Sequence, residues 1–187
     1  MNPTSTAMYD WMHILFVHGV AGVNMGQVMW QLRGHGVTYA NLHDYLQGFQ
    51  WPRFIKTVSG KDTCTPKRAK SCWSDVMFKA TASEFLSVLP VLANYITEFM
   101  YSDPAPVDFA KGVSANFLQL VAVVELILKS SRCVVQPRQL QQAIREYLHG
   151  YAMIHGTESM IIKFHYLLHH IILIFRLFTF VNNIRIK

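Results

Sequence analysis

Residues 108–130, DFAKGVSANFLQLVAVVELILKS, decide the fold class of this chain. Apolar side chains recur there at steps of three and four residues, which is the spacing of one face of an α-helix. The apolar members are Phe117, Leu118, Leu120, Val121, Val124, Leu126, Ile127 and Leu128. Nowhere in the sequence do apolar and polar residues alternate for long enough to predict a strand. We therefore expect an all-α protein of about six helices.

Residues typical of helix starts mark two of the other predicted helices. Thr81 followed by Glu84 forms a capping box, and Pro137 suits the first position of a helix. The further helices are predicted over residues 38–47, 81–99 and 137–155 and from residue 158 onward.

One long helix is predicted at the start of the chain, over residues 8–33. Gly19, Gly22 and Gly26 weaken this helix by roughly 1 kcal/mol each relative to alanine. A run of small residues also permits close helix packing, so the prediction of a helix stands.

A basic segment follows between residues 53 and 75, and we expect it to be a long loop. Six cations face a single acid, Asp62, between positions 53 and 70, so this segment alone carries a net charge of +5. Such a charge suits a phosphate backbone, although a solvated linker would have the same composition. The candidate nucleic-acid-binding residues are Arg53, Lys56, Lys61, Lys67, Arg68 and Lys70.

The remaining chemistry-bearing residues give weaker signals. Three cysteines without C-x-x-C spacing support neither a disulfide framework nor a zinc ribbon, and favour a reducing intracellular compartment. His165 and His169 have the i, i+4 spacing of a zinc-binding helix but lack the glutamate of H-E-x-x-H. We therefore expect a packed histidine pair rather than a metal site, and we predict no cofactor.

Three short motifs resemble those of one protein family. Tyr9-Asp10-Trp11-Met12-His13 resembles the D-x-x-H signature of eukaryotic cut-and-paste transposases, whose catalytic domain is RNase H-like. Lys79-Ala80-Thr81-Ala82-Ser83-Glu84 with Pro90-Val91-Leu92 is similar to the K-A-S-E…P-V-L segment of transposon-derived proteins. Lys163-Phe164-His165-Tyr166-Leu167-Leu168-His169 resembles their P-K-x-H-x-x-x-H segment, with Ile162 in place of the proline. The resemblance covers roughly residues 8–170.

The resemblance implies a helical part of a larger RNase H-like α/β protein that cuts DNA with Mg²⁺ ions held by three carboxylates. Asp10, His13 and Glu84 match the family by position, and both aspartates of the sheet would lie upstream of residue 1. Glu84 alone cannot position two Mg²⁺ ions. We therefore expect an inactive, nuclear transposase remnant, with possible DNA binding through the basic segment and self-association through apolar faces.

The C-terminal end supports a different hypothesis. Residues 166–181 are mostly apolar but fall short of the roughly 20 residues that cross a bilayer. One alternative is a buried core helix. The other, which ranks after it, is a small helical membrane protein anchored by residues 166–181. The favoured interpretation divides the chain into a domain over residues 1–170 and a tail over residues 171–187 that does not belong to the ancestral domain.

Overall fold

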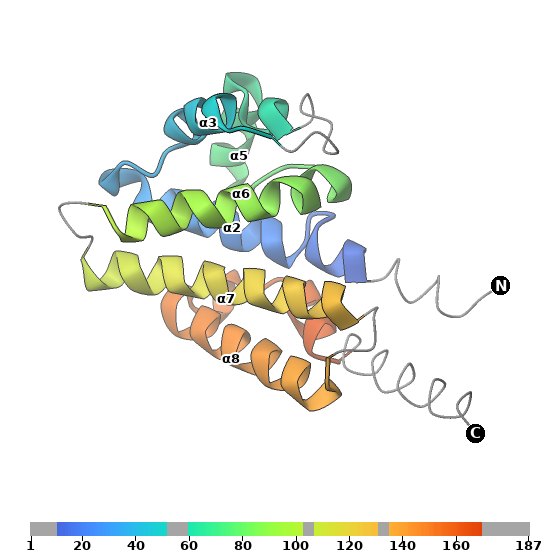
Figure 1. The fold of residues 1–187 in the computed structure, drawn as a ribbon. Coiled ribbons are helices and arrows are strands. Elements are labelled where there is room, and N and C mark those ends of the chain that lie inside the picture. Colours follow the sequence, from blue (N-terminus) through green and yellow to red (C-terminus); the bar gives the residue numbers. More distant parts are fainter. Residues whose placement is uncertain (1–10, 52–59, 103–106, 131–134, 170–187) are drawn as a thin grey trace.

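The computed structural model describes residues 11–51, 60–102, 107–130 and 135–169, and every regular element in these ranges is helical (Figure 1). The α-helices are α2 (Val20–Leu32), α3 (Tyr39–Gly48), α5 (Pro66–Asp75), α6 (Ala82–Met100), α7 (Asp108–Ser130) and α8 (Pro137–His155). Short 3₁₀ turns lie at Arg33–His35, Asp62–Cys64 and Thr157–Ser159. Helical residues 11–15 and 162–169 flank this set. The all-α prediction is confirmed.

The helices are arranged around α7, which contacts α2, α6 and α8. Figure 1 shows α8 on one side of α7, with α2 and α6 on the other side. The pair α3 and α5 covers the far side of α2 and α6, so the basic helix α5 and helix α8 lie at opposite ends of the stack (Figure 1).

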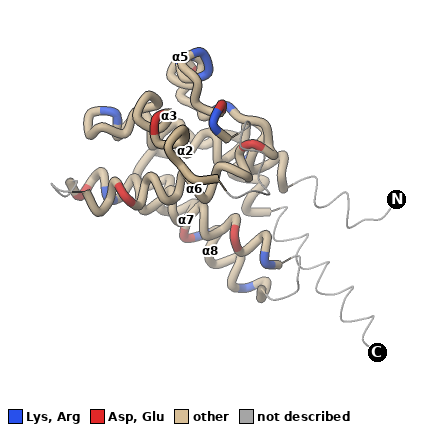
Figure 2. The backbone as a smooth tube through the Cα atoms, turned by 45° about the horizontal axis from the view of Figure 1, so that its top comes forward, with Lys and Arg blue, Asp and Glu red and all other residues tan. Residues whose placement is uncertain are grey.

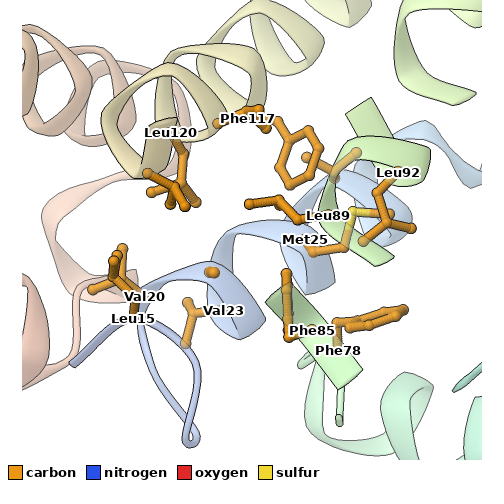
Figure 3. Packing of buried hydrophobic residues seen from close by; sticks show 14 of the residues in the cluster. Leu15, Val20, Val23, Met25, Phe78, Phe85, Leu89, Leu92, Phe117 and Leu120 are labelled. Atoms are coloured by element: carbon orange, nitrogen blue, oxygen red, sulfur yellow. The ribbon is translucent and has the colours of Figure 1, made fainter. Parts of the chain in front are cut away.

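The core is formed where α2, α6 and α7 meet. Figure 3 shows Met25 of α2, Phe85 and Leu89 of α6, and Phe117 and Leu120 of α7 pointing toward one another. All five side chains are buried. Burying one such side chain stabilises the fold by about 1.5–3 kcal/mol, so this junction contributes substantially to the stability of the described part of the chain.

One described helix, α7, is long and apolar enough to cross a membrane when judged by length and composition alone. Half of its most apolar 18-residue window is buried inside the protein. Val113, Phe117 and Val124 face the core. Packing against three neighbouring helices therefore accounts for the buried half of this window.

The prediction of one continuous helix over residues 8–33 is wrong. Residues 11–15 are helical, residues 16–19 form a turn, and α2 begins only at Val20. His18 in this turn has φ of +46°. A Cβ atom on Gly19 would lie 2.2 Å from the carbonyl oxygen of Ile14. The turn therefore requires glycine at this position, where we expected only a weakened helix.

The close packing predicted for the other two glycines of this segment does occur. A Cβ atom on Gly26 would lie 2.2 Å from the backbone oxygen of Val76, and one on Gly22 would lie 2.9 Å from that of Phe78. The backbone N–H of Phe78 also donates to the carbonyl oxygen of Gly22 at 2.8 Å. Residues 76–78 therefore lie directly on the backbone of α2, and the partner of the glycines is the turn that follows α5 rather than a helix.

The predicted helix ends agree closely with the structure. Thr81 accepts a hydrogen bond from the N–H of Glu84, and the Glu84 carboxylate accepts one from the N–H of Thr81. Pro137 is the first residue of α8, and Thr38 caps α3. The final helix differs, because a 3₁₀ turn at Thr157–Ser159 precedes the helical residues 162–169.

A buried polar cluster joins three of the core helices. The side-chain amide of Asn24 in α2 donates to Asn116 of α7 and to the hydroxyl of Tyr147 in α8, both at 3.1 Å. The amide of Asn116 donates in turn to the backbone oxygen of Tyr147 at 3.1 Å. All three residues are buried. The hydrogen bonds replace water at the two amide nitrogens, whereas the side-chain oxygen of Asn24 is buried without a hydrogen-bond partner among the described residues.

Candidate nucleic-acid interface

Part of the segment predicted as a basic loop is a helix. Residues 66–75 form α5, so the prediction of a loop over residues 53–75 is wrong for this part. Thr65 caps the helix by accepting from the N–H of Arg68 at 3.5 Å, and Pro66 occupies the first turn. A Thr-Pro pair at these positions is a known start signal, and it could have identified the helix in the sequence.

The helix carries most of the described basic residues of the segment. Figure 2 shows basic positions on α5, whereas basic and acidic positions are mixed along α7 and α8. Lys67 and Lys70 are exposed, and neither forms an ion pair with any described residue. Lys61 is partly buried at the preceding turn, and Arg53 and Lys56 lie outside the described residues.

Arg68 differs from its neighbours because it is bound within the protein. Both of its terminal nitrogens donate to one carboxylate oxygen of Glu84, at 3.1 and 3.2 Å. Burial acts to raise the pKa of Glu84, but the hydrogen bond from the Thr81 N–H and the bonds from Arg68 outweigh it and lower this pKa. The structure thus brings together two residues that the sequence placed in different candidate sites.

The ion pair also changes the interpretation of Glu84. One carboxylate oxygen accepts from Arg68, and the other accepts from the N–H of Thr81 at 2.8 Å. A carboxylate engaged on both oxygens connects α5 to the start of α6. Its described contacts are those of a structural residue.

The second family-matching position lies apart from any described cluster of ligands. His13 is exposed on the helical residues 11–15, and its carbonyl oxygen accepts from the Lys163 ammonium at 3.1 Å. Asp10 lies outside the described residues. Among the residues that the structure describes, no group of three or more His, Cys, Asp or Glu side chains could hold a metal ion.

A shallow cavity of about 560 Å³ lies beside the basic helix, between α3 and α5. Tyr39 and Trp73 form its aromatic wall, with ring centroids 4.7 Å apart in an edge-to-face arrangement. Lys70 and His43 also line it. No pattern in the sequence predicted this cavity, because Tyr39 and Trp73 lie 34 positions apart on two different helices.

The two described cysteines lie near this cavity but are not reactive nucleophiles. Burial, followed by the proximity of Cys72, raises the pKa of the Cys64 thiol. Burial also raises the pKa of Cys72, although the N–H of Lys79 donates to its sulfur at 3.3 Å and opposes the shift. Both groups stay protonated at neutral pH, and a thiol is a much weaker nucleophile than a thiolate.

The predicted histidine pair lies on the surface. His165 and His169 are both exposed on the helical residues 162–169, and their ring centroids are 4.4 Å apart. The imidazoles therefore contact each other, but they are not packed into the core. Most of the predicted membrane anchor, residues 170–181 of 166–181, lies outside the described residues, as does the whole predicted tail.

A comparison of this chain with known protein families, curated proteins and solved structures finds no match.

Proposed function

We propose that this chain is a nucleic-acid-binding helical module derived from a cut-and-paste transposase, and that it does not cut or join DNA. The observation that carries the proposal is the pair of exposed, unpaired lysines on α5, Lys67 and Lys70. By contrast, Lys111 and Lys129 of α7 each form an ion pair with an acid on the same helix. The two lysines of α5 are free to meet an external anion.

The charge around this helix favours a phosphate backbone over a single small anion. Two lysines three positions apart lie on the same face of one helix, which suits successive phosphates along a strand. Each phosphate contact releases condensed counterions, so binding of this kind weakens steeply with salt.

The arrangement around Glu84 supports the part of the proposal that this chain does not cut DNA. Two-metal cleavage needs several carboxylates that converge on a pair of ions about 3.5–4 Å apart. Glu84 is instead held by Arg68 and by its own capping box. An ion pair of this kind would have to break before the carboxylate could bind a metal.

The binding proposal is tested by fluorescence anisotropy with a labelled duplex of about 30 base pairs between about 50 and 200 mM salt. The double variant Lys67→Ala/Lys70→Ala should bind ten- to a hundredfold more weakly at about 100 mM salt, and its slope of log K against log salt should be smaller by about 2. The control Lys111→Ala/Lys129→Ala removes the same charge from α7 and should bind within about twofold of wild type. Binding that does not depend on salt, or an equal loss in the control, would contradict the proposal.

The proposed lack of cleavage has its own test. The full chain is incubated with supercoiled plasmid and Mg²⁺, and the products are separated on a gel. We expect no nicked or joined product above the level of a protein-free sample. Magnesium-dependent nicking that disappears in Glu84→Gln would show that this part of the proposal is wrong.

A further inference from the structure

The helical residues 162–169 present two imidazoles to solvent. His165 and His169 are one helical turn apart, so they lie on the same face. Both are exposed, while Phe164 and Leu167 on the other face are buried in the core. The buried pair anchors the backbone, and the helix thereby fixes the spacing of the two rings.

The distance between the rings matches that of two imidazoles bound side by side to one metal ion. Metal–nitrogen bonds of about 2.0–2.1 Å place each ring centroid roughly 3.2 Å from the ion. Two rings held at 90° then have centroids about 4.5 Å apart, and two rings at a tetrahedral angle have centroids about 5.2 Å apart. The observed separation of His165 and His169 is 4.4 Å, which agrees with the right-angle arrangement.

Right angles between nitrogen ligands are typical of tetragonal Cu²⁺ and Ni²⁺ sites, and Cu²⁺ binds nitrogen ligands most tightly among the divalent first-row ions. We propose that His165 and His169 form a surface site for Cu²⁺, and more weakly for Ni²⁺, in which water completes the coordination. This site is independent of the proposed nucleic-acid binding, because α5 lies at the opposite end of the helical stack (Figure 1).

The nearest cation on the same helix does not oppose a bound metal. The Lys163 ammonium donates to the carbonyl oxygens of His13 and Val17, and it is therefore held against the N-terminal turn. Lys163 comes two residues before His165, so the two side chains leave the helix about 200° apart around its axis. The positive charge thus points away from the proposed ion.

The experiment is a titration of the full chain with Cu²⁺, followed by electron paramagnetic resonance and visible absorption. Wild type should bind one Cu²⁺ with a spectrum typical of two nitrogen ligands. His165→Ala and His169→Ala should each weaken this binding at least about tenfold. His149→Ala, which removes an exposed and isolated imidazole from α8, should bind as wild type does.

A second measurement guards against variants that do not fold. Circular dichroism in the absence of metal should give the same helical content for all four proteins, since both imidazoles are exposed. Saturating Cu²⁺ should raise Tm in wild type and in His149→Ala but not in the other two variants, because the ion links two turns of one helix. Equal Cu²⁺ affinity in all four proteins, or a larger effect of His149→Ala, would overturn the proposal.

Discussion

Replacing Gly26 by alanine should destabilise this protein, although alanine favours a helix more than glycine does. The added Cβ atom would lie 2.2 Å from the oxygen of Val76, 2.5 Å from its carbonyl carbon and 2.6 Å from the Cα atom of Met77. All three are backbone atoms, so residues 76–78 must move by roughly 1 Å to restore normal contact distances. That movement strains the hydrogen bond from the Phe78 N–H to Gly22.

The expected magnitude combines three effects. Alanine gains about 1 kcal/mol of helix propensity, overpacking costs about 1–3 kcal/mol or more, and a broken buried hydrogen bond costs about 1–3 kcal/mol. We expect the free energy of unfolding to fall by about 2–4 kcal/mol. For a chain of this length, such a loss lowers Tm by about 5–15 °C.

The assay is thermal and urea unfolding followed by circular dichroism, with Gly112→Ala as the control. Gly112 also lies inside a helix, α7, but a Cβ atom there would meet nothing within 4 Å. The control should therefore gain about 0.5–1 kcal/mol. If Gly26→Ala is neutral or shifts in the same direction as the control, the close approach of residues 76–78 to α2 is wrong.

Three further predictions concern buried or capping groups. Burial lowers the pKa of His155 to about 4, below the roughly 6.5 of a free imidazole, so the unfolded chain alone gains this proton between those values. The free energy of unfolding should fall by up to about 3 kcal/mol as pH decreases from 6.5 to 4, and less in His155→Phe. Thr81→Ala removes the oxygen that accepts from the N–H of Glu84 and should cost about 1 kcal/mol in urea unfolding. Asn116→Ala removes two buried hydrogen bonds, one from the Asn24 amide and one to the backbone oxygen of Tyr147, and should cost about 1–3 kcal/mol in the same assay.

Each of these predictions has a control. Superimposable pH profiles of wild type and His155→Phe would show that this histidine is not responsible for the acid loss. Ser83→Ala, two residues after the cap, should have a smaller effect than Thr81→Ala, and an equal effect would contradict the capping argument. Asn94→Ala removes an exposed amide from α6 and should cost less than Asn116→Ala.

Local signals predicted much of the fold. The all-α class follows from the three- to four-residue spacing of apolar side chains, and the start of α8 at Pro137 and of α6 after Thr81 follow from single residues at helix ends. These features depend only on residues that are close together in the chain, so the local sequence is sufficient to predict them.

Features that depend on local backbone geometry or on contacts between helices were not predicted. The turn at residues 16–19 exists because Gly19 lets the chain pass close to the carbonyl of Ile14, and glycine in a helical pattern does not reveal this. The ion pair between Arg68 and Glu84 joins two helices, so neither residue signals it alone. The proposed sites rest on exposed side chains, whose exposure is a property of the assembled bundle.

The hydrogen bonds among Asn24, Asn116 and Tyr147 make the bundle selective for one arrangement of its helices. Leucine and valine faces remain in contact when one helix slides past another by a turn, about 5.4 Å. Two amides and a phenol lose their partners in the same movement, at a cost of about 1–3 kcal/mol for each stranded group. A variant with apolar side chains at all three positions would therefore keep a dry interior but gain alternative registers of α2 against α7 and α8.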